Sequence, residues 1–350
     1  MCGAAETERA PSVGALVGFA VPLLGIGLAS PLLGLVDTAV VGRCTGSLQL
    51  AALAPSVALC DITFYLFRGL GATTTAFVAA ADADDDDARA ARAVHTSVVL
   101  AALLGVAVGC LLYAGCPPLL RRLSGAAAGD ELLAEARGYV RVRALGMPAG
   151  MIFMVLQASF LGTRDWRPPT VAALVACAAN LLADILLVAK LRWGVVGAAW
   201  GTVGAHYGAA ITLTYTYVRQ RCAHPLPIAA KAAGPFLPSR VELGAWLRFG
   251  LPLTVGQLAR CVIFALVTVA ATSGGAAGAA AHQVAMSLFY STLAFGDAIS
   301  TTSQAYLPAL RTASGRARLV RRLLGVGAVT GASTALLIAS PLCVPALLRV

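Results

Sequence analysis

Three features of the sequence predict an all-α protein that crosses a membrane many times. The 350-residue chain is 59% hydrophobic and only 12% charged, with a mean hydropathy of +0.81. No ordinary water-soluble domain has this composition. The apolar residues are gathered into runs long enough to cross a bilayer, and two stretches of the first half resemble stretches of the second. The sequence therefore predicts a polytopic membrane protein built from two related helical bundles.

The membrane-spanning helices are predicted from the length of the apolar runs, because about 20 residues cover the hydrocarbon core. The runs are rich in Ala and Gly, which let helix backbones approach closely within a membrane. Nine runs meet the criterion: Val13 to Val41, Leu48 to Ala81, Val94 to Ala114, Tyr139 to Leu161, Thr170 to Ala189, Val195 to Val218, Ala245 to Ala271, Ala279 to Leu307 and Leu319 to Leu342.

The repeated stretches predict the domain organisation. "F19AVPLL" resembles "F249GLPLT", and "F67RGLGATTTAFVA" resembles "F295GDAISTTSQAYLP". An even number of spans separates the repeats, so both bundles have the same orientation in the membrane, as in transporters with parallel repeats. We expect a six-helix bundle over residues 13–218, a cytoplasmic linker over 219–244, and a second bundle over 245–350. Only about three of six helices are present in the second bundle, so it looks truncated after its third helix.

The basic residues predict orientation and exclude one class of partner. They are more numerous in the loops on the side of the N-terminus, which indicates a cytoplasmic N-terminus. Anionic lipids on that side account for the net charge of +10, so no nucleic-acid partner is expected. The expected partners are small organic substrates and the lipid bilayer, and the chain is expected to be a monomer. The sequence leaves the plasma membrane, the vacuolar membrane and the plastid envelope open.

Polar residues inside the predicted spans are the candidates for function, because burying them in a membrane is costly. Asp37 lies in the first span, and Asn180 and Asp184 lie four residues apart on one face of the fifth. With Thr202 of the sixth span, they supply the carboxylate, amide and hydroxyl oxygens that bind a small cation, and the carboxylates could instead hold a proton. We expect a site for a coupling ion here.

Other polar residues are weaker candidates. Asp61 and Arg68, both in the second span, are expected to pair with each other. Arg260 of the seventh span and Asp297 of the eighth could pair across helices or line a substrate cavity.

Four uncharged residues complete the set of cavity candidates. Tyr139, Met151 and Gln157 lie where they could line a cavity for organic molecules, which aromatic and adaptable apolar side chains favour. Gln283 could organise helix packing or contact a ligand.

Six motifs together resemble the multidrug and toxic compound extrusion family, in its DNA-damage-inducible protein F branch. They occur in the family's order between about Pro22 and Pro308. The motifs are "P31LLGLVDTAVVGR43", "L50AALAPS56", "Y139VRVRALGMPA149", "N180LLAD184", "W193GVVGAAWGT202" and "A280AHQV284".

The resemblance implies two six-helix bundles that exchange Na+ or H+ for organic substrates by alternating access. It also places the coupling site in the first bundle, where Asp37, Asn180, Asp184 and Thr202 fall on the family's positions. The sequence departs from the family in two ways: the seventh span carries no acidic residue, and the chain stops after nine predicted helices rather than twelve.

The predicted function is therefore a secondary active transporter, a cation-coupled antiporter that exports organic or xenobiotic compounds. The carboxylate and amide ligands favour H+ slightly over Na+ as coupling ion, and no cofactor or other metal is expected. A flippase for lipids or lipid-linked precursors and a transport-inactive member of the family are the alternatives. An enzyme is not expected, because no nucleophile and base or metal-ligand pattern is present.

Overall fold

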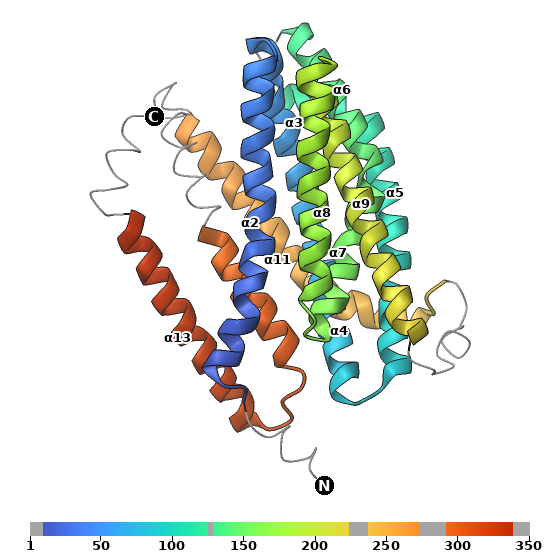
Figure 1. The fold of residues 1–350 in the computed structure, drawn as a ribbon, viewed down its shortest axis with the longest axis vertical. Helices are drawn as coiled ribbons and strands as arrows, with labels where there is room; N and C mark the ends of the chain where they lie inside the picture. The colour runs from blue at the N-terminus through green and yellow to red at the C-terminus, as the bar shows by residue number, and fades with distance from the viewer. Residues whose placement is uncertain (1–9, 125–128, 224–236, 273–291, 339–350) are drawn as a thin grey trace. The chain divides into compact units, whose positions relative to one another are not determined.

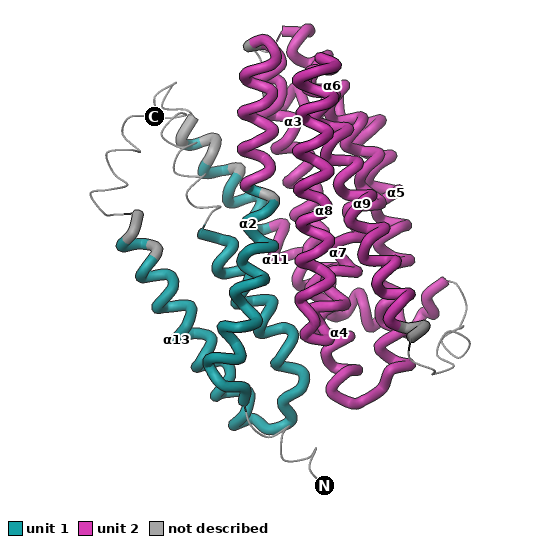
Figure 2. The backbone as a smooth tube through the Cα atoms, viewed as in Figure 1, with its two compact units in different colours: residues 1–31, 259–350 teal, residues 32–258 magenta. Residues whose placement is uncertain are grey.

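The computed structural model describes residues 10–124, 129–223, 237–272 and 292–338, which contain helices and no strand. The chain divides into two compact units, shown in Figure 2. Unit 1 comprises residues 1–31 and 259–350, and unit 2 comprises Leu32–Leu258. The boundaries fall inside two long helices: after Pro31 in α2 (Val13–Cys44) and after Leu258 in α11 (Arg240–Thr272).

Unit 2 contains most of the helices of the described chain, and Figure 1 shows them as a bundle. Within it α8 packs on α9, α5 on α7, α4 on α7 and α3 on α6. Besides parts of α2 and α11, its helices are α3 (Ser47–Leu66), α4 (Arg68–Ala83), α5 (Asp87–Ser124), α6 (Asp130–Leu145), α7 (Met147–Gly162), α8 (Arg167–Ala183), the π-helix η1 (Asp184–Lys190) and α9 (Gly194–Ala223).

The membrane-spanning character of the chain is confirmed, but fewer spans qualify than expected. Among the described residues five helices are long and apolar enough to cross a membrane, or six if the bent pair α6 and α7 counts as one. Neither α9 nor α13 (Ala313–Ile338) is among them. Hydroxyl and histidine side chains interrupt the apolar sequence of α9. Four arginines interrupt the apolar sequence of α13. The eighth and ninth expected spans lie partly outside the described residues.

Two expected spans are interrupted within the bundle. The second changes from α3 to α4 at Phe67, whose backbone N–H donates to the carbonyl of Phe64 in a tight three-residue turn. The fourth is longer than expected and bends by 47° between α6 and α7 at Gly146. Pro148 lies in the first turn of α7, where its missing N–H does least harm, and it prevents one straight helix from continuing.

Close helix packing in unit 2 depends on two glycines of α5. A Cβ atom on Gly105 would lie 2.5 Å from the Cα of Pro148, and one on Gly109 would lie 2.7 Å from the carbonyl oxygen of Ala144. Both neighbours are backbone atoms, which cannot rotate aside. The two glycines are four residues apart on one face of the helix, so they let α5 lie directly against the bend between α6 and α7.

The first turn of α11 is stabilised by a capping box and by an ion pair with α5. Ser239 Oγ accepts from the N–H of Glu242 at 3.2 Å, and Glu242 Oε2 accepts from the N–H of Ser239 at 2.7 Å. Glu242 Oε1 accepts from Nε and Nη2 of Arg92 on α5, at 3.1 and 2.5 Å. One turn further along α11, Trp246 packs edge-on against Phe77 of α4.

Unit 1 has a small core of its own within its described part. Leu16 of α2 and Leu319 of α13 are almost completely buried, and Phe19 packs edge-on against Tyr306 of the helical segment 292–306. Arg322 of α13 donates to the backbone carbonyls of residues 10 and 11. These contacts join the start of α2 to the two described helices of the C-terminal part.

Candidate functional site

Three of the four residues predicted to bind the coupling ion meet inside unit 2. Asn180 near the end of α8 is 1% exposed, Asp184 at the start of η1 is fully buried, and Asp37 of α2 is half-buried. The amide nitrogen of Asn180 donates to Oδ1 of Asp37 at 2.6 Å and to Oδ2 of Asp184 at 3.3 Å. A single amide group therefore bridges two carboxylates from different helices.

Two oxygens of this cluster have no partner among the described residues. Oδ1 of Asn180 and Oδ1 of Asp184 are buried and accept no hydrogen bond. A buried acceptor without a donor is costly, and the cost is larger for a carboxylate than for an amide. Carboxylate and amide oxygens are the ligands that hard cations prefer, and a carboxylate can also accept a proton. The cluster is therefore suited to holding one small cation.

The local backbone at Asp184 was not foreseen from the sequence. The helix that begins as α8 continues as a π-helix from Asp184 to Lys190, and it ends where the N–H of Leu191 donates to the carbonyl of Leu186. Segments of π-helix are rare in proteins, and those that occur are often found at functional sites. Here the change of helix type begins at the buried carboxylate itself, and it sets the direction in which the following residues of this span project.

Helix α9 forms one wall of the cluster through a glycine. A Cβ atom on Gly201 would lie 3.3 Å from Oδ1 of Asp184 and 3.1 Å from the Cβ of Ala183. The next residue, Thr202, is half-buried, and its hydroxyl donates to the carbonyl of Ala198 in its own helix at 3.2 Å. The structure thus brings α9 against Asp184 at Gly201, whereas the Thr202 hydroxyl makes no hydrogen bond to either carboxylate.

A second polar cluster corrects the expected pairing of Asp61. Its carboxylate forms an ion pair with Arg143 of α6, with Nη2 and Oδ1 3.6 Å apart, instead of with Arg68. The guanidinium of Arg68 lies 4.9 Å above the ring of Tyr65. Residues seven apart on a helix lie almost two full turns apart along the axis, so a partner on the neighbouring helix is closer to Asp61.

Arg143 is the charged residue that sequence reasoning missed. Its side chain is only 10% exposed, and its Nε has no hydrogen-bond partner among the described residues. The fourth expected span begins at Tyr139, so Arg143 lies near its start, and it was counted with the arginines of the preceding loop. The signal that could have identified it is its spacing from Tyr139, four residues earlier on the same face of α6.

The predicted cavity residues of unit 2 lie in or beside its apolar core. Tyr139 and Met151 are 3% and 0% exposed and belong to one cluster of buried side chains. Gln157 of α7 is half-buried. Their contact with a substrate stays a prediction.

The other cavity candidates belong to unit 1 or lie outside the described residues. Arg260 on α11 is exposed, and Asp297 in the segment 292–306 is half-buried. No ion pair joins the two within the described segments. Gln283 and its motif "A280AHQV284" lie outside the described residues.

A transition-metal site is not indicated in the part of the chain that the structure describes. No group of three or more His, Cys, Asp and Glu side chains there is arranged to hold a metal ion. The cluster of Asp37, Asn180 and Asp184 contains two such residues and an amide, which suits a proton or a monovalent cation better than zinc.

Comparison with known proteins shows that the region containing this cluster is similar to one family. The MatE family model matches residues 22–186, which include Asp37, Asn180 and Asp184. Protein DETOXIFICATION 47, chloroplastic, of Arabidopsis thaliana is 28% identical over 329 residues, covering 90% of this chain and 57% of that protein. DNA damage-inducible protein F of Escherichia coli is 31% identical over 198 residues, covering 56% of this chain and 42% of that protein. The chain therefore spans less than two thirds of the length of these relatives.

The fold is shared with solved transporters. The outward-facing structure of a multidrug resistance MATE family transporter superimposes with a TM-score of 0.80 at 23% identity, covering 98% of this chain and 74% of that one. The family model covers the first half of the chain, and the structural match extends the likeness in fold to nearly all of it. Residues 22–186 of this chain are similar to the multidrug and toxic compound extrusion (MATE) family, and its described fold is that of solved MATE transporters.

Proposed function

We propose that this chain is a cation-coupled antiporter that exports small organic compounds by alternating access. Members of the family that it resembles are transporters rather than enzymes, and one solved structure with this fold is named as a multidrug resistance transporter. The observation that carries the proposal is the bridge made by Asn180 between Asp37 and Asp184, beside two buried oxygens that have no donor. One H+ or Na+ at this site would satisfy those oxygens and offset the repulsion between the carboxylates.

The proposed mechanism links the occupancy of this site to the shape of the bundle. Asp37 belongs to α2, Asn180 to α8 and Asp184 to η1, and Gly201 places α9 against Asp184. A cation that draws the carboxylates together would change how these helices pack. The cation can drive export only if it binds the inward-open and outward-open states with different affinity. We propose that the occupied site favours the state that releases substrate.

The experiment that tests the proposal is efflux from vesicles that contain this 350-residue chain. Vesicles are loaded with a fluorescent organic cation, and an inward Na+ gradient, an inward H+ gradient, both or neither is imposed. We expect efflux to accelerate with one of the two gradients, which identifies the coupling ion. Equal efflux under all four conditions, from a chain shown to be inserted, would contradict the proposal.

We also propose that the N-terminus faces the cytoplasm and that the chain works as a monomer in the bilayer. The distribution of basic residues in the loops supports the orientation. Labelling single cysteines at the two ends of α5 with an impermeant reagent in intact cells tests it. Labelling from outside at the Asp87 end would contradict the orientation, because two spans separate that end from the N-terminus.

A further inference from the structure

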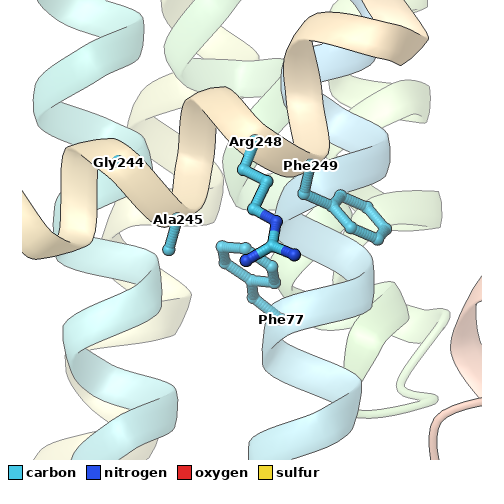
Figure 3. Close-up of a pocket in the computed structure, with 5 residues that line it drawn as sticks. All are labelled: Phe77, Gly244, Ala245, Arg248 and Phe249. Atoms are coloured by element: carbon cyan, nitrogen blue, oxygen red, sulfur yellow. The ribbon is translucent and has the colours of Figure 1, made fainter.

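A hollow lies in unit 2 between α4 and the first half of α11. Its volume is about 560 Å³, and it is lined by Phe77 of α4 and by Gly244, Ala245, Arg248 and Phe249 of α11. Figure 3 shows the Arg248 side chain extending beside the ring of Phe77, with Phe249 on the other side of it. All five residues belong to unit 2 and are apart from the cluster of Asp37, Asn180 and Asp184.

Two of the residues that line the hollow have small side chains. Gly244 and Ala245 lie four and three residues before Arg248, so they share its face of α11. A Cβ atom on Gly244 would meet no atom within 4 Å. The helix needs no glycine at this position for its own packing, and a larger side chain would occupy the hollow.

The charge of Arg248 is uncompensated within the described residues. Its side chain is exposed, and it forms no ion pair or hydrogen bond there. The nearest acidic residue along α11 is Glu242, whose two oxygens already accept from Arg92 and Ser239. Within the described residues, the hollow therefore presents an unpaired guanidinium, with five N–H donors in a geometry that matches a phosphate group.

The position of Arg248 along the helix suits the boundary between headgroups and hydrocarbon. The segment Arg240–Phe264 is apolar enough to cross a membrane, and Arg248 lies eight residues from its start, which is about 12 Å along the axis. Leu247 and Leu251, on either side of it, are 54% and 56% exposed, as expected for side chains that face lipid. From this depth an arginine side chain reaches back toward the phosphate layer.

We propose that this hollow binds one phospholipid of net negative charge. The lipid phosphate accepts hydrogen bonds from Arg248, the glycerol lies over Gly244 and Ala245, and the first part of one acyl chain packs against Phe77 and Phe249. An arginine that only extends to bulk lipid phosphates would need neither the hollow nor the small residues Gly244 and Ala245 beside it. Basic pockets beside membrane helices are a known way to bind anionic headgroups.

The test is native mass spectrometry of the purified chain with added phosphatidylglycerol or phosphatidylcholine. We expect the wild-type chain to retain one phosphatidylglycerol and to lose phosphatidylcholine. Arg248→Gln removes the charge, and Gly244→Leu places a larger side chain in the hollow while keeping the charge. Each is expected to reduce retention of phosphatidylglycerol at least about fivefold. Arg240→Gln, at the exposed first residue of the same helix, is the matched control and is expected to retain the lipid.

Several outcomes would overturn the proposal. Equal losses in Arg240→Gln and Arg248→Gln would show only general attraction to the basic end of the helix, and full retention by Gly244→Leu would show that the hollow is not occupied. Displacement of the lipid by soluble glycerol phosphate at equal concentration would point to a phosphate site without a lipid. Melting curves in phosphatidylcholine identify any variant that fails to fold, and the other variant then decides.

Discussion

Replacing Asp184 or Asp37 with Asn is expected to remove most of the gradient-driven efflux while leaving the protein folded. Each substitution keeps the shape of the side chain but removes the charge that would bind the coupling ion. An amide at either position can still accept the hydrogen bond that Asn180 donates. Coupling free energies between two ligands correspond to about 5- to 150-fold changes in affinity, so we expect the acceleration by the gradient to fall by at least about fivefold. Efflux from vesicles with and without the gradient measures this loss.

A matched control is available at the start of α6. The side chain of Asp130 is 97% exposed, and its contact with Arg121 is 3.9 Å long. Asp130→Asn removes the same charge from the chain, and we expect it to leave coupled efflux unchanged. Wild-type coupling in both Asp37→Asn and Asp184→Asn would remove the cluster from the mechanism.

A variant that keeps both carboxylates tests their geometry. Gly201→Val places a side chain against Oδ1 of Asp184, whereas Gly204→Val on the same helix meets nothing within 4 Å. We expect Gly201→Val to weaken the response to the gradient and Gly204→Val to keep it. Equal behaviour of the two variants would mean that the approach of α9 to Asp184 does not matter for coupling.

Gly105→Val is expected to destabilise the protein more than the same substitution at Gly115 of the same helix. The Cβ atom at residue 105 would overlap the backbone of Pro148, so α5 would have to move away from the bend between α6 and α7. Overfilling a packed interior costs about 1–3 kcal/mol and occasionally more. We expect the upper end of this range here, because a backbone cannot repack as a side chain can. Thermal denaturation of the detergent-solubilised protein, followed by size-exclusion chromatography, measures the difference.

Gly115→Val controls for the effect of valine itself. It introduces the same β-branched side chain into α5, where nothing lies within 4 Å of the new Cβ. Equal melting temperatures for the two variants would show that the contact of α5 with Pro148 contributes little to stability.

The cluster of Asp37, Asn180 and Asp184 was predicted in part by local sequence. The spacing of Asn180 and Asp184 already places both on one face of a helix, and the cost of burying a carboxylate marks Asp37 as unusual. Local sequence does not predict that these residues come together, because Asn180 and Asp37 are 143 residues apart in the chain. The chemistry of polar residues inside the spans and the resemblance to a family both suggested that they meet, whereas periodicity alone did not.

The partner of Asp61 shows why pairing is harder to predict than burial. The sequence offered Arg68 on the same span, and the structure gives Arg143 on another helix. Charges inside a bundle pair with whatever helix packs beside them, and the packing order is not encoded in one helix. For the same reason "G105VAVG109" marks α5 as closely packed, without naming Pro148 and Ala144 as the backbone it meets.

By itself, the sequence determined that the chain is helical and membrane-spanning, and it marked the polar residues that a membrane would not tolerate without a purpose. These properties depend on composition and on periods of a few residues, which can be read along the chain. Only the tertiary structure decided that one amide bridges two carboxylates, that Asp184 begins a π-helix, and that Arg248 lines a hollow with no ion-pair partner among the described residues. These features depend on how the helices pack against one another and on the space left between them. No single stretch of sequence contains that information.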